Sequence, residues 1–165
     1  MKLSINGIKE QEAWKKAGIA LPGYDVEAAS ENAKENPVWV HFGIGNIFRV
    51  FIGGIADGLL EEGVLDRGIT CVETFDYDVA DKIYDPYDNL GLSVILQGDG
   101  TREYKVVGAF AEAVKAQSSN VAQWKRLKEI FTSKSLQMVS FTITEKGYAL
   151  SLIHISEPTR QAEIS

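Results

Sequence analysis

The sequence predicts an α/β fold in which a largely parallel sheet carries helices on its faces. Two short apolar runs at 37–42 and 69–72, rich in β-branched and aromatic residues, are typical of buried strands. Between them, residues 46–62 place large apolar side chains at helical spacing along one face. A strand, a helix and a second strand in this order form a βαβ unit, whose crossover is almost always right-handed.

The remaining elements are predicted from the same periodicities and from turn residues. The expected helices lie at 6–18, 76–84 (a short helix or turn), 110–117 and 120–131. The expected strands lie at 91–97, 101–107 and 136–143. Gly98-Asp99-Gly100 separates the first two of these strands and signals a hairpin, so we expect an inserted β-hairpin. Residues 21–36 carry Pro22, Gly23 and many polar residues and are predicted to be a connection.

Composition argues against several classes of function. The 165-residue chain has a formal net charge of −6 with scattered Lys and Arg residues, so it lacks a basic stripe for nucleic acid. No stretch approaches the roughly 18 apolar residues that span a bilayer, and the N-terminus lacks a signal-peptide pattern. We therefore expect no membrane partner and a cytoplasmic location. The cysteine and the two histidines have no metal-ligand spacing. Cys71 is expected to be a core residue, and His41 a core or edge residue of its strand.

The segment that carries chemistry is Gly43-Ile44-Gly45-Asn46-Ile47-Phe48-Arg49, directly after one predicted strand and at the start of a predicted helix. The first glycine allows a tight turn, and the second lets the backbone approach a diphosphate. The helix start then offers free N–H groups and a partial positive charge. Phe48 stands where the usual third glycine would be. The alternative interpretation is an ordinary strand-to-helix turn.

Acidic residues follow the next predicted strand. Glu73 and Asp76 come about 30 residues after the glycines, where a carboxylate accepts from a ribose 2′-hydroxyl and repels a 2′-phosphate. This pattern predicts NAD rather than NADP as the cofactor, and the alternative is a solvated acid at a strand end. Thr144 and Glu145 follow a third predicted strand and are expected to face the nicotinamide end of the cofactor, unless they serve as capping residues.

Three segments of the chain occur in the same order in a known family. They are Val38-Trp39-Val40-His41-Phe42-Gly43-Ile44-Gly45-Asn46-Ile47-Phe48-Arg49, Glu73-Thr74-Phe75-Asp76-Tyr77-Asp78 and Val139-Ser140-Phe141-Thr142-Ile143-Thr144-Glu145-Lys146-Gly147-Tyr148. With them, residues 35–150 resemble the mannitol dehydrogenase family of polyol-specific long-chain dehydrogenases, and most closely its branch acting on D-mannonate and D-fructuronate. The resemblance implies a Rossmann-type domain and a metal-free, NAD-dependent hydride transfer between a polyol or sugar acid and the matching keto compound.

The resemblance also implies roles for individual residues. The implied cofactor contacts are Gly43, Gly45, Asn46, Ile47, Phe48, Arg49, Asp76 (with Glu73 as the alternative acid), Thr144 and Glu145. The histidines that many members carry beside the arginine of the first segment are absent here. Thr142 matches the first threonine of the family's Thr-x-Thr-Glu segment, near cofactor and substrate. The family's catalytic base is a lysine in a later, mostly helical domain, so no catalytic residue is assigned and no turnover is expected from this chain alone.

The chain is predicted to divide into three parts. Residues 1–36 are an N-terminal helix and a connection, and residues 37–150 are an incomplete, truncated NAD-binding domain. Residues 151–165 continue no period and are similar to the translation of a sequencing-library adaptor, so we expect a non-native tail. Two alternatives stay open. One is a non-catalytic dinucleotide-binding module, and the other is a chain too incomplete to hold a cofactor, whose open sheet edge promotes aggregation.

Overall fold

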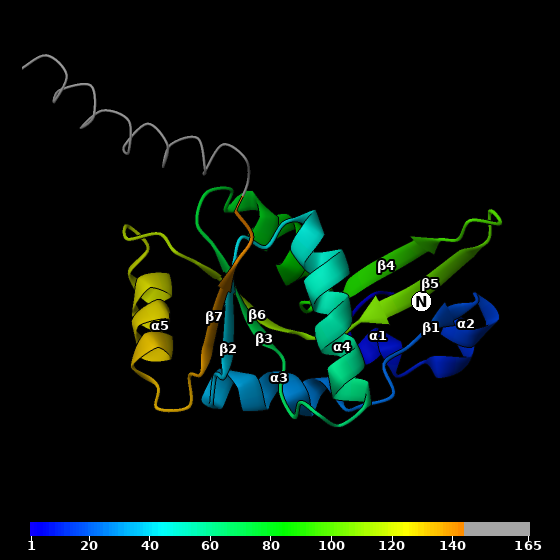
Figure 1. The fold of residues 1–165 in the computed structure, drawn as a ribbon, viewed down its shortest axis with the longest axis horizontal. Helices are drawn as coiled ribbons and strands as arrows, with labels where there is room; N and C mark the ends of the chain where they lie inside the picture. Colours follow the sequence, from blue (N-terminus) through cyan, green and yellow to red (C-terminus); the bar gives the residue numbers. More distant parts are fainter. Residues whose placement is uncertain (144–165) are drawn as a thin grey trace, which may run out of the picture.

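Two sheets organise residues 1–143, the part of the chain that the computed structural model describes (Figure 1). The main sheet has four parallel strands in the order β6-β3-β2-β7. They are β2 (Trp39–Phe42), β3 (Ile69–Glu73), β6 (Phe110–Lys115) and β7 (Met138–Phe141). Within this sheet, the chain runs first through β2, then outward through β3 to β6, and finally returns to the other side of β2 as β7. This is the order of the first four strands of a doubly wound sheet, and it confirms the predicted Rossmann-type α/β fold.

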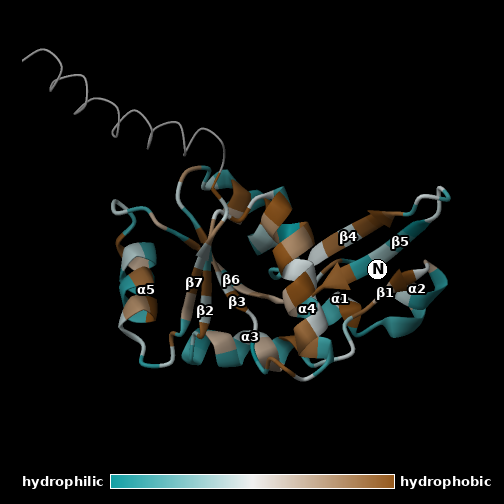
Figure 2. Ribbon diagram, viewed as in Figure 1, coloured by the Kyte–Doolittle hydropathy of each residue, from teal (hydrophilic) through white to brown (hydrophobic). Residues whose placement is uncertain are grey.

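Helices cover both faces of the main sheet. On one face, the π-helical turn η1 (Phe48–Ile52) continues into α4 (Gly53–Glu61) and forms the crossover from β2 to β3. Phe48 and Leu60 of this crossover are buried together with Cys71 of β3. On the opposite face, α5 (Val121–Thr132) buries Ile130 against β2, β3 and β6. Figure 2 shows hydrophobic residues along the strands between α5 and α4, where the core lies.

A second, smaller sheet stands beside the first. β1 (Ile19–Ala20) runs parallel to β5 (Arg102–Val107), and β5 pairs in antiparallel register with β4 (Gly91–Leu96). The β4–β5 pair is the predicted hairpin. The region of the predicted helix 6–18 forms two short helices instead of one, α1 (Ile5–Ile8) and α2 (Gln11–Lys16). Trp14 of α2 is buried in one cluster with Val106 of β5. Two short helical turns, η2 (Ala80–Tyr84) and η3 (Asp85–Tyr87), lead from β3 to the hairpin.

A buried carboxylate fixes the hairpin to the crossover helix. Asp57 of α4 is fully buried. Its Oδ1 accepts hydrogen bonds from the Tyr24 hydroxyl (2.5 Å) and from the Gly108 amide (2.9 Å), and its Oδ2 lies 2.7 Å from the Lys105 ammonium. A buried charge is costly unless it is paired and hydrogen-bonded. The cluster therefore holds the end of β5 and the segment around Tyr24 in one arrangement against α4.

The predicted helix over 110–117 is wrong, because this segment forms the strand β6. Its alanine and glutamate residues favour a helix in isolation. In the structure, β6 pairs in parallel with β3 along its whole length, and Phe110, Ala111 and Val114 are buried. The hydrogen bonds and burial gained at the edge of β3 override the local preference, which is why strand propensity depends so strongly on context.

The predicted connection over 21–36 is wrong in its later part, which is the helix α3 (Val26–Glu35). The Asp25 side chain caps this helix by accepting a hydrogen bond from the Ala28 amide (3.0 Å). Ala29 and Ala33 then lie one turn apart and are buried. The polar residues that suggested a loop occupy the outer face of the helix.

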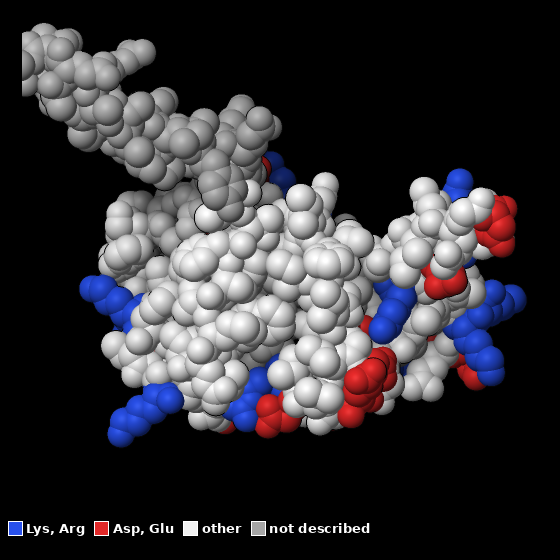
Figure 3. Space-filling view, viewed as in Figure 1, with Lys and Arg blue, Asp and Glu red and all other residues white. Residues whose placement is uncertain are grey.

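The surface of the described residues has few charges near the edge strand. Within residues 1–143, β7 pairs with β2 alone, and Met138 and Phe141 of β7 are exposed. On the face drawn in Figure 3, Lys and Arg side chains are dispersed around the periphery, and the surface over β7 and α4 is mostly uncharged.

No helix among residues 1–143 is long and apolar enough to cross a membrane. Residues 144–165, with the predicted tail 151–165, lie outside the described residues.

Candidate functional site

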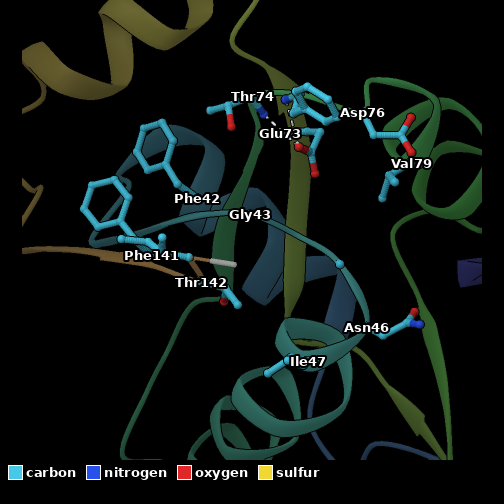
Figure 4. A pocket seen from close by; sticks show the side chains of 13 residues that line it. Phe42, Gly43, Asn46, Ile47, Glu73, Thr74, Asp76, Val79, Phe141 and Thr142 are labelled. Atoms are coloured by element: carbon cyan, nitrogen blue, oxygen red, sulfur yellow. Dashed lines mark hydrogen bonds between the residues drawn. The ribbon is translucent and has the colours of Figure 1, made fainter. Parts of the chain in front are cut away.

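A cavity of about 770 Å³ opens beyond the carboxyl ends of β2, β3 and β7 (Figure 4). The start of the helix that follows β2 and the loop that follows β3 complete its walls. The strand order reverses at this place, because β2 has its successor β3 on one side and β7 on the other. Ligands of open α/β sheets bind at such a reversal. The topology therefore marks this cavity before any side chain is considered.

Gly43 makes the turn from β2 into the cavity wall. Its φ is +86°, in the left-handed region that favours glycine. A Cβ at this position would lie 2.6 Å from the Thr142 carbonyl oxygen, so the residue after β7 packs directly on the turn. The Gly43 amide donates a hydrogen bond to Val72 O (3.0 Å), which ties the turn to β3 as well. Only glycine satisfies both requirements.

Gly45 leaves a space instead of filling one. A Cβ there would meet no atom within 4 Å, and the residue lines the cavity. Within the described residues, the amides of Gly45, Asn46 and Ile47 have no protein acceptor, and the first bond of the helix runs from Arg49 N to Gly45 O (3.1 Å). Free amides at a helix start, approached without a Cβ in the way, form an anion-binding surface.

Two carboxylates stand on the opposite wall, at the end of β3. Glu73 is largely buried, and its Oε1 accepts hydrogen bonds from the Thr74 amide (2.9 Å) and the Phe75 amide (3.0 Å). Glu73 therefore shapes the loop that follows the strand. Asp76 is exposed on the wall of the cavity. Of the two acids, Glu73 bonds to the loop amides, whereas the exposed Asp76 carboxylate makes no such bond among the described residues.

Aromatic side chains form a third wall. Phe42 of β2 and Phe141 of β7 stack with ring centroids 5.0 Å apart and planes 17° apart. Phe75, in the loop after β3, is 93% exposed and also lines the cavity. Figure 4 shows the two stacked rings on the side of the cavity away from Asp76. The site thus combines an apolar surface for flat rings with polar groups at its ends, as is typical of small-molecule sites.

A buried histidine lies under the glycine turn. His41 of β2 is fully buried, with Nδ1 2.7 Å from Ser140 Oγ and Nε2 2.7 Å from Thr142 Oγ1. Burial lowers the pKa of His41 to about 4, so its ring is neutral at neutral pH. Phe48 stacks on the ring from the helix side. Cys71 is a core residue, as the sequence predicted, and of the two predicted places for His41, core or edge, the structure shows the core.

Most of the sequence-predicted contact residues meet at this cavity. Those that line it are Gly43, Gly45, Asn46, Ile47, Glu73 and Asp76. Two others do not. Phe48 is completely buried in the core, and the Arg49 guanidinium bonds to the Asn46 side chain and lies 6.0 Å from the centre of the Tyr84 ring. Thr144 and Glu145 lie outside the described residues. Their part in binding stays a prediction.

Sequence reasoning missed the aromatic wall. The sequence pattern places Phe42 and Phe141 in strands and indicates no role for Phe75, which lies between the two acids. The available signal was position, because each of the three stands within three residues of the carboxyl end of a predicted strand. Among the described residues, no group of three His, Cys, Asp or Glu side chains could hold a metal ion.

Comparison with known proteins gives relatives for both sequence and fold. No protein-family model matches the chain. The chain is 48% identical over 148 residues to D-mannonate oxidoreductase of Thermotoga maritima, and the match covers 90% of this chain and 27% of that protein. The fold is similar to D-sorbitol dehydrogenase in substrate-free form and to Pseudomonas fluorescens mannitol 2-dehydrogenase in a ternary complex with NAD and D-mannitol.

Both structural matches have a TM-score of 0.68 at 25% identity, and each covers 90% of this chain and 28% of the other. The chain thus spans about a quarter of the length of the relatives it matches. The sequence match and the shared fold thus agree with the resemblance of this chain to the mannitol dehydrogenase family.

Proposed function

We propose that the cavity binds NAD(H), and that the chain is the cofactor-binding portion of an oxidoreductase acting on a sugar acid or polyol. D-Mannonate and D-fructuronate are the proposed substrate pair, because the relative with 48% identity is a D-mannonate oxidoreductase. One observation carries the binding proposal. Free helix-start amides and the Gly45 space face a cavity at the strand-order reversal of a parallel sheet.

The residues present fit a dinucleotide. The amides of Gly45, Asn46 and Ile47 would hold the diphosphate, with the Arg49 charge nearby beside Asn46. The Asp76 carboxylate would accept hydrogen bonds from a ribose, with Glu73 as the alternative. When bound, NAD(H) supplies hydride transfer, and the protein supplies binding and orientation. Thr144 and Glu145 are proposed to contact the nicotinamide end, and no residue of this chain is proposed as the catalytic base.

Substitution of Gly45 tests the diphosphate site. A valine side chain at 45 enters open space, so the fold should survive, but it would occupy the approach to the free amides. We expect Gly45→Val to weaken NADH binding by at least about tenfold in a fluorescence titration, about 1.4 kcal/mol. Gly58→Val is the matched control, because Gly58 also faces open space but does not line the cavity. Equal NADH affinity in Gly45→Val and wild type would refute the proposed site.

Substitution of the acids tests the choice of cofactor. A carboxylate accepts hydrogen bonds from the ribose of NADH and repels the 2′-phosphate of NADPH. Asp76→Asn should therefore weaken NADH binding and lower the ratio of NADH affinity to NADPH affinity. Glu73→Gln should have the smaller effect, because Glu73 Oε1 is already bonded to two loop amides. The measurement is a parallel titration with NADH and NADPH. An unchanged ratio of the two affinities in both variants would overturn the preference for NAD.

A further inference from the structure

Four side chains form a continuous line of hydrogen bonds between β2 and β7, directly under the cavity. Trp39 Nε1 donates to Ser140 Oγ, and the same Oγ faces His41 Nδ1, each at 2.7 Å. On the other side of the ring, His41 Nε2 faces Thr142 Oγ1 at 2.7 Å. The parallel register that sets His41 opposite Ser140 brings these side chains to one face of the sheet. The line ends at Thr142, which lines the cavity beside the Gly43 turn (Figure 4).

The histidine in this line is held neutral and in place. His41 is fully buried, and Phe48 covers one face of its ring at a centroid distance of 4.2 Å. Burial lowers the pKa of His41 to about 4. A neutral imidazole has one ring nitrogen that donates and one that accepts. The two hydroxyls on either side must therefore adopt opposite roles toward the ring.

The indole of Trp39 decides the direction. An indole N–H only donates, so Ser140 Oγ accepts there and keeps its own proton. If Ser140 donates that proton to His41 Nδ1, then Nε2–H donates to Thr142, and every bond runs head to tail. In the reverse direction, Ser140 accepts from both Trp39 and His41, and its own proton faces no acceptor among the described residues. The head-to-tail order leaves only the Thr142 proton free, at the cavity.

We propose that Trp39, Ser140 and His41 orient the Thr142 hydroxyl as a hydrogen-bond donor to an oxygen of the bound dinucleotide. The inference rests on the proposed NAD(H) site. Thr142 would be the contacting residue, and the other three are positioning residues that act through it. Because the Thr142 hydroxyl accepts a hydrogen bond from His41 Nε2–H, the ring does not compete for the hydroxyl proton, and Thr142 can donate it to the ligand. Such preorganisation strengthens binding by reducing the cost of ordering the hydroxyl.

The tautomer of His41 gives a test that needs no ligand. Nitrogen-15 NMR of the free chain distinguishes a protonated from an unprotonated ring nitrogen, and the His41→Gln variant assigns the signal. We expect Nδ1 to be unprotonated and Nε2 to carry the proton at neutral pH. Ser140→Ala should abolish this single tautomer, because it removes the donor to Nδ1. A ring with the proton on Nδ1 would overturn the proposed direction.

A double-mutant cycle tests the effect on binding. Thr142→Val removes the hydroxyl and should weaken NADH binding by about fivefold to tenfold, whereas Thr142→Ser should stay within about twofold. Ser140→Ala leaves Thr142 intact and should weaken binding by about threefold. In the Thr142→Val background, however, Ser140→Ala should have no further effect, because its effect passes through that hydroxyl. Additive effects would mean that Ser140 is merely structural and would overturn the proposal.

Failure of this proposal can be told from failure of the proposed function. If wild type binds no NADH, the NAD(H) site itself is refuted, and the role of Thr142 with it. If wild type binds NADH but His41 carries its proton on Nδ1, or the cycle is additive, only the orienting line is refuted. Unfolding in urea, measured for each variant, identifies any loss of affinity that comes from an unfolded chain.

Discussion

The ring of Phe48 stacks on the ring of His41, with centroids 4.2 Å apart and planes 14° apart. Phe48 occupies the place of the third glycine in the usual dinucleotide-binding motif, where a small residue lets the helix approach the strand. Here the space between helix and strand is filled by two flat rings instead. The replacement of the third glycine by Phe48 therefore changes the packing under the turn. The turn itself keeps Gly43 and Gly45.

Removal of this ring should destabilise the fold strongly. Phe48 is fully buried and also contacts Phe110, at a centroid distance of 5.4 Å. We expect Phe48→Ala to lower the free energy of unfolding by about 3–5 kcal/mol, from lost burial and the cavity left behind. Phe51→Ala is the control, because Phe51 is 67% exposed and should change stability by less than about 0.5 kcal/mol. Similar values for the two variants in urea denaturation would contradict the stacking account.

Stability should fall in mild acid because of His41. Its pKa is about 4 in the fold and 6.5 as the ordinary value, so between these values the unfolded chain binds more protons. The free energy of unfolding should therefore decrease as the pH falls from about 6.5 towards 4, by up to roughly 3 kcal/mol. His41→Gln should be less stable at neutral pH but should lose this part of the pH dependence. Parallel slopes for both proteins would show that another group is responsible.

Two glycines in the crossover helix should respond to alanine in opposite ways. A Cβ at Gly53 would overlap the ring of Phe110, whereas a Cβ at Gly58 meets nothing within 4 Å. We expect Gly53→Ala to destabilise the fold by about 1–3 kcal/mol through overpacking. Gly58→Ala should stabilise it by about 0.5–1 kcal/mol, because alanine is the better helix former. Thermal unfolding of the pair measures both, and the same sign in both would refute the packing difference.

The edge strand should make this chain self-associate. Within the described residues, β7 pairs only with β2, and its Met138 is 44% exposed. Unpaired, apolar strand edges pair readily with other chains, and a lysine on the edge opposes this. Met138→Lys should therefore shift sedimentation velocity profiles of the 165-residue chain towards the monomer. Profiles that stay the same would locate any association at another surface.

The sequence by itself determined the elements whose local pattern agrees with their place in the fold. The buried strands β2 and β3, the crossover helix and the β4–β5 hairpin all carry periodicity or turn residues that require no distant partner. The glycines at 43 and 45 and the acids at 73 and 76 could be named for the same reason. Each follows a strand, and parallel strands bring their carboxyl ends to one edge.

Tertiary structure decided what depends on a distant neighbour. Residues 110–117 prefer a helix locally, and only the hydrogen-bonding edge of β3 makes them a strand. Phe48 packs as it does because the ring of His41, on β2, lies against it. The line of hydrogen bonds from Trp39 to Thr142 exists only because β7, about 100 residues later in the chain, pairs beside β2. Local sequence encodes backbone preferences, but these contacts form when the sheet assembles, and their free energy exceeds the local preference.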